Sequence, residues 1–423
     1  MFRNIADIKK EVAVLDIGTR TVCAAILKRE KNERSNASLG LLGETRVLGV
    51  GYQLAKGMKV GVINDFESLE EAILGAVASA EKEAERTIKS VFVSIPTWAI
   101  ESHAVESSTS IGQIPVDEIH LSSLLNFDTS ECIDEHEEII HTFPISYSVD
   151  GNSGIKEPRG TVGDKLSATF HVLTVPSLFL KNIRNCLNRN NIEVLGFIDS
   201  TYASALVTTL SEEISSGVTI VDIGGATTSV ACLYDGVPLY FGYVPLGGQS
   251  ITDDISKVLR ITRASAERLK ILHGVSGNVI GDEQVLVTRV DEYGEEHAQN
   301  ISKKMLDAII SARLEEILDK VQEHIYNCGA DKVMYQSIVL TGGGSQLSGL
   351  SEFIRLKKYF SDVSVRLGKP IGVTGSHDFV RTQAFASTAG TALYCLGEFV
   401  GKNFQNKEKS IWQRLMVWFK RGI

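Results

Sequence analysis

The sequence predicts an α/β protein of two lobes, each built on a sheet that opens with a hairpin. An apolar run at 12–17 ends in Asp16-Ile17-Gly18-Thr19 and leads into a second strand-like run at 21–27. A near copy of this hairpin appears in the second half, where residues 218–221 lead into Asp222-Ile223-Gly224-Gly225. The chain has 423 residues, more than the roughly 250 to 300 at which a single core stops growing. Two related lobes follow from these observations.

The remaining elements follow from periodicity and turn residues. In the first half we expect helices at 69–84 and 178–190, a strand at 90–94, and a small α+β insertion over 90–166. In the second half we expect helices at 252–259 and 263–272, strands within 278–290, a long amphipathic helix at 301–325, and a buried strand at 338–340. A polar segment at 401–410 is expected to be a flexible linker before a closing helix.

The composition narrows the class of function. Hydrophobic residues make up 43% and charged residues 22%, which is typical of a soluble globular protein; we expect no membrane-spanning segment and no secretory signal. The net charge of −9 argues against nucleic acid as a partner, because phosphate backbones need a basic surface. The six cysteines form no CxxC pair and are expected to be reduced, structural thiols of a cytoplasmic protein.

Three glycine-rich turns at strand ends indicate a phosphate site. Exposed amides in the turns at Gly18-Thr19 and Gly224-Thr227 would face a phosphate tail from opposite lobes. Asp16 and Asp222 would repel phosphate directly, so we interpret them as holding Mg2+ through its water ligands. The alternative is that such turns are ordinary turn chemistry, which explains one hairpin more easily than two.

Further residues complete the predicted site. The turn Gly342-Gly343-Gly344-Ser345 leaves no side chains above the strand end, which suits a nucleoside. Gly247 and Gly248 precede a helix whose N-terminus could also meet phosphate. Glu267 and Lys270 lie three apart on one helical face, where solvated surface is the ordinary explanation.

The closing segment is predicted to be an amphipathic helix at a membrane surface. Its apolar face can enter the lipid surface, and the cations on its polar face can pair with anionic lipid. Val417 is the one apolar residue on the polar face. The alternative is docking on the body of the protein or in a partner groove. The membrane-facing candidates are Ile411, Trp412, Arg414, Leu415, Trp418, Phe419, Lys420 and Arg421.

With these motifs in hand, the chain resembles the FtsA family within the superfamily of actin, heat-shock ATPases and sugar kinases. The resemblance rests on the two hairpins, on the segment Gly57-Met58-Lys59-Val60-Gly61-Val62-Ile63-Asn64-Asp65, on Val244-Pro245-Leu246-Gly247-Gly248, on Leu272-His273-Gly274 and on the triple glycine. It implies a two-lobed actin-like (ribonuclease H-like) ATPase fold with an inserted α+β subdomain and a C-terminal amphipathic helix. It covers nearly the whole chain.

The resemblance also implies domain boundaries. The first lobe (subdomain 1A) would comprise 1–89 and 167–202, and an SHS2-like insertion (1C) 90–166. The second lobe (2A) would comprise 203–250 and 311–400, with subdomain 2B at 251–310. The linker would be 401–410 and the membrane-targeting helix 411–423.

Carried over to this sequence, the resemblance implies binding of ATP and Mg2+. The implied nucleotide-binding residues are Gly18, Thr19, Arg20, Gly224, Gly225, Ala226, Thr227, Gly247, Gly248, Glu267, Lys270, Gly342, Gly343, Gly344 and Ser345. Asp16 and Asp222 would hold Mg2+ through water. Asp199 is the nearest candidate for positioning a catalytic water, although a helix-capping role competes. Because Ala226 and Ser229 depart from the family pattern, we expect at most weak ATPase activity.

The function implied is that of a cell-division protein at midcell on the cytoplasmic face of the inner membrane. It would polymerise like actin, tether FtsZ through that protein's C-terminal peptide, and recruit later division proteins. The FtsZ contact is expected near Lys303, Lys304 and Arg313. A sugar or acetate kinase would have no use for a membrane helix, and a chaperone would need a peptide-binding domain. A pilus-assembly adaptor of the PilM type remains the closest alternative.

Overall fold

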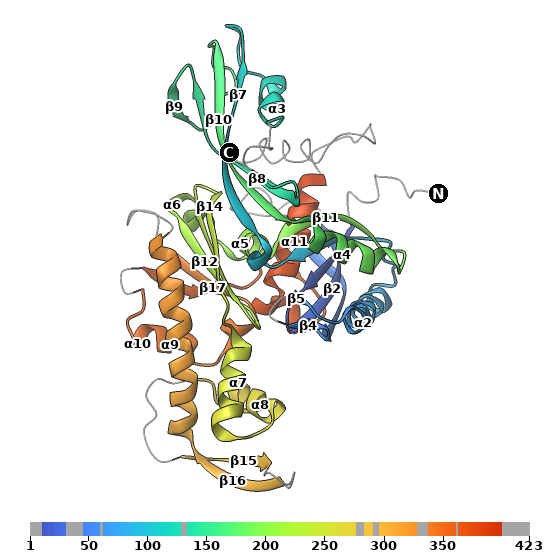
Figure 1. Ribbon diagram of the computed structural model, residues 1–423, viewed down its shortest axis with the longest axis vertical. Coiled ribbons are helices and arrows are strands. Elements are labelled where there is room, and N and C mark those ends of the chain that lie inside the picture. Colours follow the sequence, from blue (N-terminus) through green and yellow to red (C-terminus); the bar gives the residue numbers. More distant parts are fainter. Residues whose placement is uncertain are drawn as a thin grey trace.

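The computed structural model describes residues 11–30, 45–59, 62–127, 133–275, 283–290, 296–327, 337–360 and 363–399. These residues form two lobes side by side, with a smaller sheet projecting from one end and a helical subdomain with a hairpin at the other (Figure 1). The predicted two-lobed α/β fold with an α+β insertion is confirmed.

The first lobe is built on a six-stranded sheet in the order β11-β6-β1-β2-β3-β19. The predicted hairpin is present, because β1 and β2 pair antiparallel, while β1 pairs parallel with β6 on its other side. The strands are β1 (Glu11–Ile17), β2 (Thr21–Arg29), β3 (Thr45–Leu54), β6 (Ser90–Ile95), β11 (Glu193–Asp199) and β19 (Val373–Thr374), with the short pair β4 (Met58–Lys59) and β5 (Val62–Ile63) beside them.

Helices cover both faces of this sheet. On one face, α2 (Phe66–Ala84) and α4 (Ser177–Asn188) bury the apolar stripe that their spacing predicted. The start of α2 is fixed by Asp65, whose carboxylate accepts the amides of Glu67 and Ser68 at 3.1 and 3.2 Å. On the other face lie α5 (Ser200–Thr208) and α11 (Ala386–Phe399), together with the short turns η4 (Asp378–Arg381) and η5 (Gln383–Phe385).

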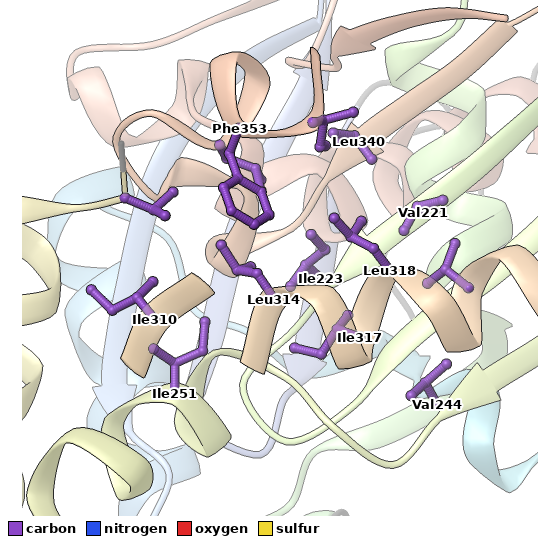
Figure 2. Packing of buried hydrophobic residues seen from close by; sticks show 14 of the residues in the cluster. Val221, Ile223, Val244, Ile251, Ile310, Leu314, Ile317, Leu318, Leu340 and Phe353 are labelled. Carbon is purple, nitrogen blue, oxygen red and sulfur yellow. The ribbon is translucent and has the colours of Figure 1, made fainter. Parts of the chain in front are cut away.

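The second lobe repeats the hairpin in a five-stranded sheet, β14-β13-β12-β17-β18. The long helix α9 (Lys303–Asn327) runs along it, and Figure 2 shows Ile310, Leu314 and Leu318 of α9 packed among strand and helix residues of this core. The strands are β12 (Val218–Ile223), β13 (Thr228–Tyr234), β14 (Val237–Val244), β17 (Ser337–Thr341) and β18 (Ser364–Leu367). The helices are α6 (Ser211–Ser216), α7 (Gly248–Leu259), α8 (Arg263–His273), α9 (Lys303–Asn327), η3 (Gly343–Gln346) and α10 (Leu350–Leu356), and the hairpin is β15 (Gln284–Val290) with β16 (Glu296–Ser302).

The insertion is a four-stranded sheet, β7-β10-β8-β9, and its limits differ from the predicted 90–166. Strand β6 belongs to the first lobe, where it pairs with β1 and β11. At the other end, β10 pairs with β7 as far as residue 174 and with β8 as far as residue 176, well inside the segment assigned to the first lobe. The elements are η1 (Thr97–Ala99), β7 (Glu101–Ser110), α3 (Glu118–Leu124), β8 (Glu137–Val149), β9 (Asn152–Ile155) and β10 (Lys165–Pro176).

The predicted second lobe is wrong at its C-terminal end. Strand β19 pairs with β3 of the first sheet, and α11 packs against β1 and β6. The boundaries at 202/203 and 310/311 also fall inside α5 and α9. The local sequence of β19 and α11 does not indicate which of the two sheets they join. Only the packing of the folded chain assigns them to a lobe.

Candidate functional site

The two hairpin turns have the same internal hydrogen bond. The amide of Gly18 donates to the Thr21 carbonyl at 3.0 Å, and the amide of Gly224 donates to the Thr227 carbonyl at 2.9 Å. A Cβ atom added at Gly225 would lie 3.0 Å from the Cβ of Arg20, so the turns of the two lobes face each other. The repeat seen in the sequence is therefore a repeat of backbone geometry.

The amides that can meet a phosphate lie one or two residues beyond the first glycine of each turn. Because the Gly18 and Gly224 amides close the turns, they shape the site and are not donors to a ligand, which corrects that part of the prediction. Among the described residues, no backbone carbonyl accepts the amides of Thr19, Arg20 and Gly225, nor that of Ala226. Successive unpaired amides in such turns form an anion-binding nest.

The third glycine turn and the start of α7 meet the second hairpin. Gly342 has φ of +82°, and a Cβ atom there would lie 2.1 Å from a carboxylate oxygen of Asp222. The amides of Gly248 and Gln249 donate to the carbonyls of Gly224 and Gly225 at 2.9 and 2.7 Å. The predicted phosphate-binding role of Gly247 and Gly248 therefore changes. The N-terminus of α7 supports the second hairpin turn, because amides there already donate to the carbonyls of that turn.

Ser345, the last residue of the predicted nucleoside turn, is fully buried. Its hydroxyl donates to the Gly342 carbonyl at 2.8 Å and so braces the turn. Gly344 also has no room for a side chain, since an added Cβ would lie 2.5 Å from the Ile223 side chain. Gly343 is different, because its nearest neighbour would be the Ala384 methyl group at 3.8 Å, an ordinary contact.

Glu267 and Lys270 form a partly buried network and are not solvated surface. Lys270 Nζ donates to Glu267 at 2.8 Å and to the Gly248 carbonyl at 2.8 Å, while Glu267 also pairs with Arg20 of the first lobe. Burial acts to raise the pKa of Glu267, but hydrogen bonds from Lys270 and Thr252 hold it below its ordinary value. This network links the first hairpin turn to α8 across the two lobes.

Asp16 and Asp222 lie together at the floor between the lobes. Burial raises the pKa of Asp16 to about 7, and the negative charge of Asp222 adds to the effect. Burial likewise raises the pKa of Asp222 to about 6, although the Ser204 hydroxyl donates to it at 2.9 Å. In the described part of the chain, no lysine or arginine pairs with either carboxylate. A divalent cation held through water fits this donor set, because it would balance both charges.

Several residues around the aspartates were not predicted. Thr388 of α11 donates to Asp16 at 3.4 Å, and the hydroxyls of Ser94 on β6 and Ser387 on α11, 2.6 Å apart, act with it to lower the pKa of Asp16. The one sequence feature that could have predicted these contacts is the run of small residues Ala386-Ser387-Thr388-Ala389-Gly390. Such a run is equally typical of close helix packing.

Asp199 caps a helix, and no part of its side chain is exposed. Its carboxylate accepts the Tyr202 amide at 2.6 Å and the Thr97 hydroxyl at 2.6 Å. Burial raises its pKa to about 7. Of the two interpretations of Asp199, the structure supports helix capping, because both carboxylate oxygens accept hydrogen bonds and the side chain is fully buried.

The predicted partner residues lie along one end of α9. Lys303 pairs with Glu283 at 2.8 Å, and Arg313 holds Asp254 of α7 at 2.6 and 3.0 Å. Lys304 is exposed. Arg313 thus has a structural role at this surface, and Lys304 is the most available of the three cations.

Other sequence predictions lie outside the described residues. These are the linker 401–410 and the candidate membrane helix with Ile411, Trp412, Arg414, Leu415, Trp418, Phe419, Lys420 and Arg421. None of the helices in the described ranges is long and apolar enough to cross a membrane. The four described cysteines are buried, as expected of structural thiols.

Solved structures share the fold. A chain of a PilM-PilN type IV pilus biogenesis complex superposes with a TM-score of 0.62 at 14% identity, covering 91% of this chain and 98% of that one. MreB5 of Spiroplasma citri bound to AMPPNP superposes with a TM-score of 0.52 at 15% identity, covering 91% and 96%. The fold and the facing glycine turns thus define an actin-like protein.

Sequence comparison gives the family within this class. Residues 219–390 match the family model described as cell division protein FtsA, and 99–174 match the SHS2 domain inserted in FtsA. The FtsA of Agrobacterium fabrum is 31% identical over 385 residues, which is 90% of this chain and 86% of that protein. The FtsA of Escherichia coli is 27% identical over 98% of this chain and 96% of its own length. The chain belongs to the FtsA family of cell division proteins.

Proposed function

We propose that this chain binds ATP with Mg2+ between its lobes and uses the nucleotide to control actin-like self-assembly. The observation that carries the proposal is the meeting of three glycine turns around Asp16 and Asp222. The unused amides at 19–20 and 225–226 would bind the phosphates, and the two aspartates would hold the ion through its water shell. The nucleotide-bound MreB5 structure, with the same fold, supports this assignment.

The nucleoside would lie above the triple-glycine turn, beside the Glu267–Lys270 network. Lys270 and Glu267 hold the N-terminus of α7 against the second phosphate turn, so they would position that turn as well as contact the ribose. ATP turnover is expected to be weak, because Asp199 is buried as a helix cap. Nucleotide would then act as a ligand that shifts the protein between two conformations.

At the level of the cell, we propose that the protein tethers FtsZ to the inner face of the cytoplasmic membrane at midcell and recruits later division proteins. Family membership supports this role. The tail at 411–423 would bind anionic lipid, and the FtsZ C-terminal peptide would dock near Lys303, Lys304 and Arg313. The PilM-type alternative shares the fold, but the matches to the FtsA family model and to the SHS2 domain inserted in FtsA favour cell division.

Substitution of Gly343 tests the nucleotide site. Gly343→Asp places bulk and negative charge where the nucleoside must lie, and titration calorimetry with Mg-ATP should detect no binding. Gly343→Ala is the matched control, because its added methyl group has an ordinary 3.8 Å neighbour and the fold has room for it. Unchanged ATP affinity in the Gly343→Asp protein would refute the site.

A further inference from the structure

One face of the insertion sheet gathers an imidazole and two carboxylates near the first lobe. Glu101 on β7 pairs with Thr174 on β10, and Thr174 pairs with Ile139 on β8. Side chains two residues apart on a strand share a face, so His103 lies with Glu101, and Glu137 lies with Ile139. The three side chains therefore project on one face of the sheet from β7 and β8, the two strands that flank β10.

Their distances already suit metal coordination. One ligand atom from each of Glu101, His103 and Glu137 lies within 4.8 Å of the other two. His103 Nε2 lies 3.3 Å from a carboxylate oxygen of Glu137. Two ligands at about 2.1 Å from a tetrahedral ion lie roughly 3.4 Å apart, so this pair needs almost no movement.

The second independent observation is the buried charge of Glu137. Its side chain is only 8% exposed, yet in the described part of the chain neither lysine nor arginine pairs with it. Its carboxylate contacts the His103 imidazole and accepts a hydrogen bond from the Thr174 hydroxyl at 2.7 Å. The adjacent Glu138, by contrast, has Arg184 as its ion-pair partner. A buried carboxylate without a cation is costly, and a bound ion would remove that cost.

We propose that Glu101, His103 and Glu137 bind a divalent transition-metal ion of the zinc class. An imidazole nitrogen with two carboxylates suits Zn2+, whereas Mg2+ and Ca2+ prefer oxygen ligands throughout. Thr174 is a positioning residue, since its hydroxyl donates to Glu137 and accepts from His103 Nε2 at 2.8 Å; the ion would take the place of the Nε2 proton. The ion joins β7 to β8 across β10 and stiffens the base of the insertion.

The test is zinc binding by the untagged full-length chain, measured by competition with a chromophoric chelator in the presence of excess Mg-ATP. All proteins carry Cys132→Ser and Cys328→Ser, because thiols bind zinc strongly and these two cysteines lie outside the described residues. The parent should bind one ion per chain. His103→Gln and Glu137→Gln should each weaken binding at least tenfold, whereas His136→Gln, which changes a neighbouring imidazole that is 85% exposed, should not.

Three results would overturn the site. These are a parent that binds no stoichiometric zinc, a His103→Gln protein that binds like the parent, and an equal loss on changing His136. If His103→Gln or Glu137→Gln does not fold, as judged by circular dichroism, Glu101→Gln makes the same test at an exposed position. Displacement of the zinc by millimolar Mg2+ would show a nonspecific acidic surface and would also refute the proposal.

Discussion

At the scale of single residues, the site is defined by the pairing of two carboxylates. Asp16 and Asp222 end equivalent strands of the two sheets, and their neighbours are hydroxyl groups of serine and threonine. Hydroxyls can satisfy a carboxylate by hydrogen bonding but cannot cancel its charge. The folded protein therefore keeps a negative centre between its lobes, which is where a cation and a polyphosphate would meet.

This pairing predicts how stability depends on pH without nucleotide or metal. The Asp16 carboxyl has a pKa of about 7 in the folded protein, against 3.8 as its ordinary value, so the folded state binds the proton more tightly. The free energy of unfolding should therefore fall as the pH rises from about 4 to about 7. Asp16→Asn should remove part of this dependence and raise Tm at pH 8 by roughly 2 °C, for a gain of about 1 kcal/mol.

Scanning calorimetry in EDTA at several pH values checks this expectation. Asp378→Asn, at an exposed carboxylate outside the site, is the control and should follow the parent. A Tm of the Asp16→Asn protein that tracks the parent at every pH would show that burial and the charge of Asp222 do not raise the pKa of Asp16 in the folded protein.

At the scale of elements, the crossing of α5 and α11 joins the lobes. The pair packs on the first sheet, and Tyr202 and Ala205 of α5 also bury against strands of the second. At the crossing, a Cβ atom on Gly390 would lie 1.7 Å from the Ala203 carbonyl oxygen, so the helix backbones are in direct contact. Because α11 also carries Ser387 and Thr388 to Asp16, this contact sets the geometry of the site.

Gly390→Ala should therefore destabilise the protein by about 1 to 3 kcal/mol, since the helices must separate. Gly75→Ala in α2 is the matched control, because its added methyl group would meet only the flexible Gln53 side chain, at 3.1 Å. At that half-buried helix position alanine should be neutral or stabilising by about 0.5 to 1 kcal/mol. Urea unfolding compares the two, and equal midpoints would mean that the α5–α11 contact is not tight.

At the scale of the whole molecule, the insertion touches both lobes. It leaves the first lobe at η1 and also contacts the β13–β14 hairpin of the second, where Lys156 pairs with Asp235 and the His171 imidazole lies 2.8 Å from the Pro238 carbonyl oxygen. A change in the angle between the lobes would therefore act on the insertion. This arrangement would give the proposed nucleotide a physical route from the lobes to the insertion.

The proposed membrane attachment is a second property of the whole chain. Burying Trp412, Leu415, Trp418 and Phe419 at a bilayer surface should contribute several kcal/mol at about 25 cal/mol per Å2, and each cation adds roughly 1 kcal/mol on anionic lipid. Trp418→Glu places a charge in the apolar face and should reduce binding to anionic vesicles at least tenfold, leaving ATP affinity unchanged. Val417→Glu, on the polar side, should be much milder.

Co-sedimentation of these variants with vesicles, beside a chain truncated after Ser410, makes the comparison. The membrane role fails if the truncated chain and the Trp418→Glu protein both pellet like the parent. In that case the tail belongs to a protein interface.

The sequence by itself determined the features that depend on neighbouring residues. The two hairpins, the glycine turns and most helix limits were predictable, because strand alternation, turn residues and helix caps act within a few positions. Tertiary structure alone decided which sheet β19 and α11 join, that β6 lies outside the insertion, and that Asp199 is buried as a cap. It also brought Ser94, Ser204 and Ser387 to the aspartates. Those outcomes depend on packing between segments far apart in the chain, and such contacts leave no mark in the local pattern.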